Sequence, residues 1–335
     1  MLQAYALVAA LSELGHDVEL VDYDQPATTR YFRPKFSFPP RINQYVRYFR
    51  CKRFVKNHQV TSEEHCTSIA EFSRFSANYD VLFTGSDQVW FTGPVQYYDP
   101  MYFLDFKFDG IKASYAPSAG GLESFGEFEA KVKTALSEFN FISIRDDNTQ
   151  RLVSALTDKP ITRVCDPTFL HHFDELTTTS SPLDKPYFLI FGNIPRERYD
   201  VIKAHAQKAG VETIVTLQYR NDGLANKRIA APDPITWLNY IKHAAFVYTT
   251  YFHGSVFSIK FHRELIAIPT AGRVKKVGTV MADCGLSDRV ILNDSSNDAL
   301  RAMSEAKIDW TAVDSRVNQF KSQSITYLKT VTDMI

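Results

Sequence analysis

The chain has 335 residues with 44% hydrophobic side chains, which is long enough for two domains of ordinary size and typical of a globular protein. Lysine plus arginine and aspartate plus glutamate both number 38, so no overall charge favours nucleic acid or a membrane as partner, and an anion site must be local. The four cysteines lie far apart without C-x-x-C spacing, and no apolar run reaches the roughly 18 residues that span a bilayer, so we expect reduced thiols and a cytoplasmic protein.

The chain opens on a helical pattern at about residues 2–14, which Gly15 ends, followed by a strand at 17–23 (DVELVDY). An α/β unit normally begins with a strand rather than a helix. We therefore expect the first strand of the N-terminal domain, and the loop after it, to be missing from this start.

Between Asp24 and Glu63 the sequence contains no acidic residue. Aromatic side chains are interleaved there with basic ones, which are Arg30, Arg33, Lys35, Arg41, Arg47, Arg50, Lys52, Arg53 and Lys56. From Ile42 onward the apolar side chains fall at helical spacing, which predicts a basic amphipathic helix. One interpretation is peripheral contact of residues 30–56 with lipid headgroups or with a diphosphate-linked substrate. The other is a solvated helix whose aromatic side chains pack on the first domain.

Strand-like runs recur further along the chain, each followed by small or polar residues and then a helical pattern. They are YDVLFTGSD, IKASYAPSAG, NFISIRDDN and TRVCDPTF, then KPYFLIFGN, VETIVTLQY, AAFVYTTYFHG, ELIAIPTAG and RVILND. Strands that alternate with helices predict an α/β protein with parallel sheets. The polar segment TTTSSPLDKP is the best linker, so we expect one Rossmann-like domain at 1–175, a second at 182–335 and a cleft between them. The last helix is expected to pack back on the first domain.

Ligands of doubly wound sheets bind beyond the carboxyl ends of the strands, so the polar residues that follow strand-like runs are the candidate site residues. In chain order they are Ser86, Asp87, Arg145, Asn193, His253, Gly254, Ser255 and Arg273. With a helix that starts near Ser255, His253 would lie at its amino end, where backbone N–H groups suit a phosphate or carboxylate. The alternative is an inert histidine at a strand–helix corner. Asp166 precedes Pro167, which is typical of a turn, and it is left out of the catalytic set.

The chain also carries, in this order, LQAYALVAALSELGHDVELVDY, TGSDQVWF, YFLDF, ASYAPSAG, ISIRDDNT, CDPTFL, TYFHGSVFSIKF and RVKKVGTVMADCGLSDRVI. Together these segments resemble the polysaccharide pyruvyl transferase family. The resemblance implies a two-domain fold like that of GT-B glycosyltransferases. It also implies transfer of pyruvate from phosphoenolpyruvate to two hydroxyls of a sugar, as a cyclic ketal, during assembly of surface polysaccharide such as capsule or exopolysaccharide. Phosphate leaves, and no metal, nucleotide or other cofactor is expected.

The resemblance also implies roles for the candidate residues. His253 would bind the donor and act as the general acid that protonates the methylene carbon of the enol. The donor carries a phosphate and a carboxylate, and the residues expected to bind it are Arg145, Gly254, Ser255 and Arg273. Asp87 would either orient or deprotonate an acceptor hydroxyl, or cap the next helix.

On the acceptor side we expect Ser86 and Asn193 to bind a glycan. A lipid-linked glycan would place the protein at the inner face of the membrane. Before the histidine, many relatives have a polar or arginine residue where this chain has Thr250 and Tyr251, so another cation such as Lys275 or Lys276 would serve there. Two other functions stay open, a GT-B glycosyltransferase that uses a nucleotide sugar and a non-catalytic glycan-assembly subunit.

Overall fold

The structure, a computed structural model, describes residues 1–25, 42–93, 98–218 and 223–335. The chain divides into two compact units. Unit 1 comprises Met1–Arg33, Val55–His171 and Asn318–Ile335, and unit 2 comprises Pro34–Phe54 and His172–Val317. The part of the predicted basic stretch that precedes Ile42 lies outside the described residues.

Unit 1 is built on short parallel strands. Strand β3 (Val81–Thr84) pairs with β4 (Ile111–Ser114), and β5 (Ile142–Ile144) pairs with β6 (Ile161–Arg163). A single parallel bridge from Ala113 to Phe141 links the two pairs, so the carboxyl ends of all four strands point the same way. A further parallel pair joins β1 (Leu20–Tyr23) to β2 (Thr61–Cys66).

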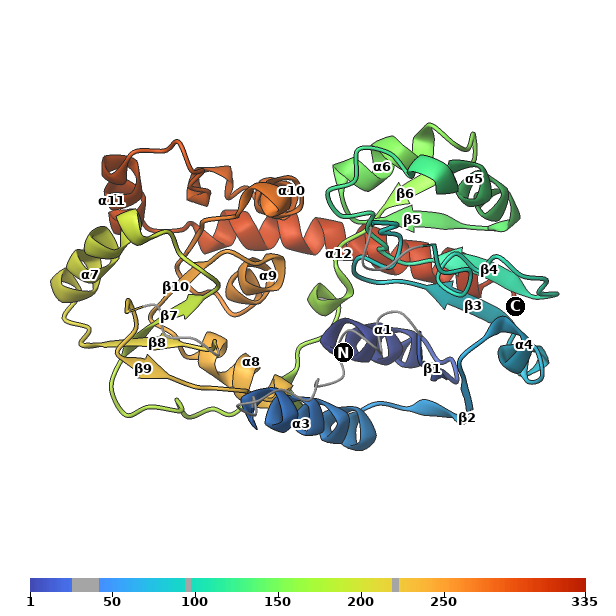
Figure 1. The fold of residues 1–335 in the computed structure, drawn as a ribbon, viewed down its shortest axis with the longest axis horizontal. Helices are drawn as coiled ribbons and strands as arrows, with labels where there is room; N and C mark the ends of the chain where they lie inside the picture. The colour runs from blue at the N-terminus through green and yellow to red at the C-terminus, as the bar shows by residue number, and fades with distance from the viewer. Residues whose placement is uncertain (26–41, 94–97, 219–222) are drawn as a thin grey trace. The chain divides into compact units, whose positions relative to one another are not determined.

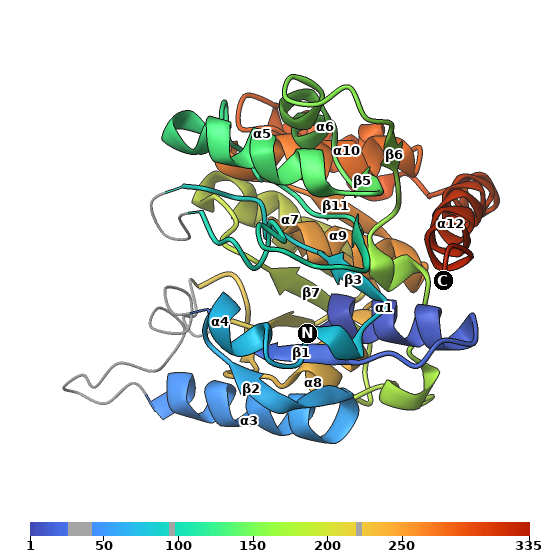
Figure 2. The ribbon, with the colours of Figure 1, turned by 90° about the vertical axis from the view of Figure 1, so that its right-hand side faces the viewer.

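The helices of unit 1 are α1 (Leu2–Glu13), α4 (Ile69–Phe72), α5 (Glu129–Glu138) and α6 (Asp147–Ser154). Figures 1 and 2 both show α5 and α6 beside the strands β5 and β6. Helix α6 begins where it does because the Asp146 side chain caps it, accepting a hydrogen bond from the Thr149 backbone N–H at 2.8 Å. This cap also fixes the backbone directly after β5.

The end of the chain completes unit 1. Helix α12 (Trp310–Thr332) passes from unit 2 into unit 1 at Asn318. The Tyr327 hydroxyl donates to the Ser114 carbonyl of β4 at 2.8 Å, and the Ser324 hydroxyl accepts from the Cys165 N–H at 2.9 Å. These bonds hold the last helix against the ends of two strands.

Aromatic side chains fill the core of unit 1. The buried Trp90 indole stacks on Phe103 with ring centroids 5.7 Å apart, and its N–H donates to the Tyr102 carbonyl at 3.0 Å. The Thr84 hydroxyl donates to the same carbonyl at 2.6 Å. The tryptophan of the GSDQVW segment is therefore a structural anchor that fixes the loop carrying Asp87.

Unit 2 contains one five-stranded parallel sheet in the order β11-β10-β7-β8-β9. Its strands are β7 (Tyr187–Phe191), β8 (Thr213–Thr216), β9 (Lys227–Arg228), β10 (Phe246–Thr249) and β11 (Leu265–Ala267). A strand was also expected within RVILND. The structure contradicts this, since that run forms one isolated bridge from Val290 to Ala267 and then turns into a loop.

Helices cover both faces of this sheet (Figure 1). They are α7 (Tyr199–Lys208), α8 (Pro234–Lys242), α9 (Phe252–Lys260), α10 (Val274–Asp283) and α11 (Asn297–Glu305). Phe188 and Tyr248 share one face with Ile202 of α7 and Leu300 of α11. On the other face the Tyr187 hydroxyl donates to the Tyr240 carbonyl of α8 at 2.8 Å. Alternate residues of one strand thus serve opposite layers, as in a doubly wound sheet.

Helix α3 (Ile42–His58) confirms the sequence prediction of a helix from Ile42. Its residues up to Phe54 belong to unit 2, and the chain from Val55 onward belongs to unit 1.

Candidate active site

In unit 1 the polar residues predicted from the sequence meet at the carboxyl ends of the strands. Ser86 and Asp87 follow β3, and Arg145 follows β5. The Arg145 guanidinium donates from Nη2 to Asp87 Oδ1 at 2.9 Å and from Nη1 to Asp166 Oδ2 at 2.8 Å. Three strand ends, separated by up to 79 residues of sequence, are therefore joined by one side chain.

Two members of this cluster were not assigned a site role from the sequence. Gln3, on α1, donates from Nε2 to Asp166 Oδ2 at 3.0 Å and to the Ser86 hydroxyl at 2.9 Å. Asp166 also forms the predicted turn, since its Oδ1 accepts from the Thr168 N–H at 3.1 Å. The Asp-Pro pair signalled only the turn, and a lone glutamine in a helix gives no signal at all.

Burial separates the members of the cluster. The side chains of Arg145 and Asp166 are each 1% exposed, whereas that of Asp87 is 48% exposed. Burial by itself lowers the pKa of Arg145, but the carboxylates of Asp87, Asp166 and Asp146 outweigh it and raise that pKa above its ordinary value. The guanidinium therefore stays charged, and Asp87 presents its carboxylate to solvent from a fixed position.

Gly85 permits the close approach that places Ser86 and Asp87. Its φ is 131°, and a Cβ there would lie 1.9 Å from the Tyr115 carbonyl oxygen. Asp87 itself has a φ of 80°, in the left-handed region that aspartate tolerates better than most residues. The loop after β3 is thus tight against the loop after β4.

In unit 2 the candidate histidine lies where β10 meets α9. The helix begins at Phe252, with Tyr251 as its N-cap, and not near Ser255 as the sequence predicted. His253 consequently lies in the first turn of α9 and is half-buried, with its ring in edge contact with Phe252 at 5.1 Å. A first-turn position keeps it beside the backbone N–H groups that have no partner within the helix.

Gly254 and Ser255 are both buried inside this turn. A Cβ at residue 254 would lie 2.1 Å from Thr249 Oγ1 and 2.9 Å from a Phe191 ring carbon, so glycine is required for packing of α9 on the strands. The Ser255 hydroxyl lies 3.4 Å from the Tyr251 carbonyl oxygen. Donor binding by these two residues stays a prediction, and what the structure shows for them is a packing role.

A cation lies against Tyr251, the N-cap residue of the helix that carries the histidine. The Arg273 guanidinium carbon is 4.4 Å from the centre of the Tyr251 ring, and its Nη1 donates to the Thr270 hydroxyl at 3.0 Å. The Tyr251 ring in turn packs on Phe191 with centroids 4.8 Å apart. A guanidinium stacked on a ring keeps its edge N–H groups available for an anion. Tyr251 is therefore the platform that holds an arginine from the next strand–helix connection.

Asn193 is exposed beyond the end of β7, next to Gly192. Gly192 has a φ of 119°, and a Cβ there would lie 1.9 Å from Thr250 Oγ1. A side chain at residue 192 would therefore collide with Thr250, so glycine permits the close packing of the ends of β7 and β10. Asn193 lies at the same carboxyl edge as Tyr251 and His253.

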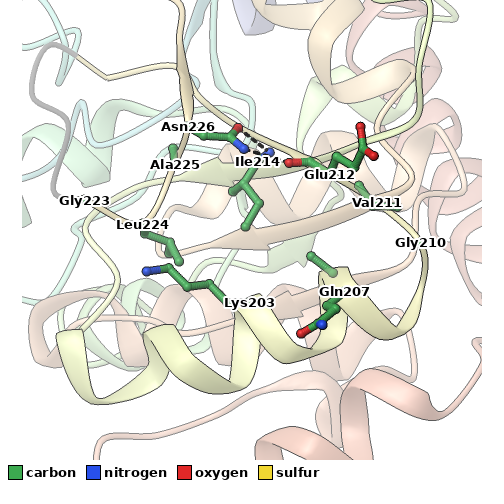
Figure 3. A pocket seen from close by; sticks show the side chains of 11 residues that line it. Lys203, Gln207, Gly210, Val211, Glu212, Ile214, Gly223, Leu224, Ala225 and Asn226 are labelled. Atoms are coloured by element: carbon green, nitrogen blue, oxygen red, sulfur yellow. Dashed lines mark hydrogen bonds between the residues drawn. The ribbon is translucent and has the colours of Figure 1, made fainter.

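A cavity of about 510 Å³ lies elsewhere on unit 2, between the end of α7 and the start of β8 (Figure 3). Asn226 occupies part of its wall, where its side chain accepts from the Ile214 N–H at 2.9 Å and donates to the Glu212 carbonyl at 2.7 Å. This is the amino end of the strands, whereas ligands of such sheets bind at the carboxyl end. The Asn226 side chain in its wall is also committed to backbone, so we do not assign the site to this cavity.

Across the described ranges, no group of three or more histidine, cysteine, aspartate or glutamate side chains is arranged to hold a metal ion. None of the helices that the structure describes combines the length and apolar character needed to cross a bilayer.

Comparison with solved structures identifies the fold class of the chain. UDP-GlcNAc 2-epimerase from Methanocaldococcus jannaschii is 11% identical, with a TM-score of 0.53 over 92% of this chain and 89% of that one. UDP-GlcNAc 2-epimerase from Neisseria meningitidis bound to UDP-GlcNAc is 7% identical, with a TM-score of 0.52 over 99% and 95%. At such identities the likeness concerns the fold alone, which is the α/β GT-B fold.

Within that class the sequence is more specific. Residues 1–272 match the family described as polysaccharide pyruvyl transferase. The chain belongs to this family of transferases. Among curated proteins, the sequence has no significant match.

Proposed function

We propose that the protein transfers pyruvate from phosphoenolpyruvate to two hydroxyls of one sugar, forming a cyclic ketal and releasing inorganic phosphate. The observation that carries this proposal is the pairing of family membership with a cationic site at the carboxyl edge of the unit 2 sheet. There, His253 and the stacked Arg273 guanidinium lie on neighbouring strand–helix connections. A donor with one phosphate and one carboxylate suits that site in charge.

The chemistry assigns each residue a role. His253 donates a proton to the methylene carbon, which leaves an oxocarbenium-like carbon that the first sugar hydroxyl attacks as it loses its proton. Phosphate then departs with the C–O bonding electrons, and the second hydroxyl adds to the same carbon, gives its proton to the now neutral His253 and closes the ring. Arg273 binds the donor anion throughout and stabilises the phosphate as it leaves.

The unit 1 cluster serves the acceptor in this proposal. Asp87 orients an acceptor hydroxyl and accepts its proton, with Ser86 as a second hydrogen-bonding group. Arg145 was expected to clamp the donor, but both of its terminal nitrogens donate to carboxylates within unit 1. We therefore assign it, together with Asp166 and Gln3, the positioning of Asp87. Asn193 on unit 2 remains an acceptor contact.

The test is incubation with phosphoenolpyruvate and a glycan acceptor, followed by phosphate release and by the mass of an acid-labile carboxylate on the glycan. His253→Ala is expected to abolish both signals without loss of folding. His65→Gln, at an exposed histidine of β2 paired with Asp22, is the matched control and keeps full activity. Turnover that persists in His253→Ala would remove the histidine from the mechanism.

A second candidate is a glycosyltransferase that uses a nucleotide sugar, which the fold likeness to UDP-GlcNAc 2-epimerases favours. A third is a non-catalytic glycan-assembly subunit. Donor binding without phosphate release on any acceptor would favour this last function.

We propose further that the acceptor is a glycan carried on a lipid, in capsule or exopolysaccharide assembly. The protein would then work at the cytoplasmic face of the inner membrane.

A further inference from the structure

Helix α3 has a charge unlike that of the chain as a whole. The chain is neutral overall, yet α3 contains no aspartate or glutamate. Its basic residues are Arg47, Arg50, Lys52, Arg53 and Lys56. The helix therefore carries a local concentration of positive charge, although the chain as a whole has no net charge.

One side of α3 is attached to the protein. Phe54 is buried, and Arg50 donates from Nη1 to the Ala231 carbonyl at 2.8 Å within unit 2. Burial raises the pKa of Cys51 on the same side. These contacts fix the helix and leave its opposite side outward.

The outward side combines apolar and basic groups. Ile42 is 66% exposed and Phe49 is 64% exposed. They are seven residues apart, so they lie on one stripe of the helix. Lys52, Arg53 and Lys56 follow Phe49 at three, four and seven residues and are exposed on the same side. The stripe therefore has two bare apolar side chains at one end and a group of cations at the other.

We infer that this stripe of α3, defined by Ile42, Phe49, Lys52, Arg53 and Lys56, docks the protein on an anionic lipid bilayer. Cations alone would suit any polyanion, including an acidic glycan. Exposed Ile and Phe side chains in the same stripe suit a surface with an apolar layer beneath its charges, into which they insert while the cations stay at the headgroups. The inference rests on the proposed function in one respect, because it names the surface on which a lipid-linked acceptor would be met.

The experiment is co-sedimentation of the full-length chain with two kinds of vesicle, phosphatidylcholine alone and phosphatidylcholine mixed with phosphatidylglycerol. We expect binding to the anionic vesicles only, weakened by salt because the attraction is between exposed charges. The triple charge reversal Lys52→Glu, Arg53→Glu, Lys56→Glu should lower the affinity about a hundredfold or more. Ile42→Ser with Phe49→Ser should lower it less and leave its salt dependence unchanged.

The matched control reverses the same number of charges elsewhere, with Lys133→Glu on α5, Lys203→Glu on α7 and Lys329→Glu on α12, all exposed. It should still bind anionic vesicles with most of the wild-type affinity. An equal loss in this control, equal binding of wild type to both vesicles, or no binding to either would overturn the inference. If the wild type bound neither kind of vesicle, a protein or a glycan would be the better candidate partner for the stripe.

Turnover with phosphoenolpyruvate and a soluble acceptor separates this inference from the proposed function. The α3 variants should keep wild-type phosphate release on that acceptor. Vesicle binding without any turnover would contradict only the proposed catalytic function. Turnover without vesicle binding would contradict only the inferred docking surface.

Discussion

Arg273 is positioned by the Tyr251 ring, on which it stacks, and by the Thr270 hydroxyl, to which it donates a hydrogen bond. Loss of a charge-assisted contact to the donor costs about 1.5–3 kcal/mol, so Arg273→Ala should raise KM for phosphoenolpyruvate by about tenfold to a hundredfold. Tyr251→Leu removes the stacking and should raise it only several-fold, since a cation–π contact contributes about 0.5–2 kcal/mol. Tyr251→Phe keeps the ring and serves as the control. Phosphate-release kinetics measure all three, and an unchanged KM in Arg273→Ala would exclude a donor contact.

Gly85 has no room for a side chain, because the atoms that a Cβ would meet belong to the backbone of Tyr115. Because an added Cβ would lie 1.9 Å from the Tyr115 carbonyl oxygen at a φ of 131°, Gly85→Ala should destabilise folding by about 3 kcal/mol or more. Gly278 of α10 has open space around it, so Gly278→Ala should stabilise by about 0.5–1 kcal/mol. Urea titration distinguishes the two, and equal stabilities would contradict the tight packing of the two loops.

At the scale of an element, the ends of β3, β5 and β6 act together through Arg145. Asp166→Asn leaves that buried guanidinium with one carboxylate partner fewer and should cost about 3–5 kcal/mol of stability. It should also lower kcat by about tenfold to a hundredfold through displacement of Asp87, with KM for phosphoenolpyruvate unchanged.

The control for this variant is Asp147→Asn, where an exposed carboxylate pairs with Arg163 and little stability is at stake. A raised KM for phosphoenolpyruvate with unchanged kcat in Asp166→Asn would instead place the cluster on the donor side, as first expected for Arg145.

Most elements could be predicted from local sequence, and the exceptions have physical reasons. The helix at 2–14 and most of the strands up to 267 follow directly from hydrophobic period, whereas β2 and β9 were not predicted. The start of α9 was misplaced because its N-cap residue, Tyr251, makes no side-chain cap, whereas Ser255 is a residue type typical of an N-cap. The strand within RVILND failed because a single bridge to Ala267 is all the pairing that run obtains.

The candidate site was only partly predictable. Rules about strand ends selected Asp87, Arg145 and His253 because those positions depend on local order along the chain. They could not find that the Gln3 amide donates to Asp166 Oδ2, since the contact spans 163 residues and depends on how α1 packs. Nor could they pair Arg273 with Tyr251, because stacking depends on side-chain direction and not on spacing.

For the whole molecule, ligand-dependent stability separates the candidate functions. A ligand that binds only the folded protein increases the free energy of unfolding, by about 2.7 kcal/mol at a concentration a hundredfold above its Kd. The melting temperature rises as a result. We expect this with phosphoenolpyruvate and no shift with UDP, measured by thermal unfolding. Arg273→Ala should lose most of the shift, which controls for nonspecific anion effects. A shift with UDP alone would favour the glycosyltransferase.

The final helix has a consequence for anyone who trims this gene. The family match ends at residue 272, yet the first unit still lacks Ser324, Tyr327 and Leu328 at that point, and all three are buried side chains. A shortened clone that stops at residue 272 would encode a first unit without this part of α12. The surface that α12 covers would then be exposed to solvent. We expect such clones to aggregate. Any loss of activity in them would then come from an incomplete first unit and would say nothing about the catalytic residues.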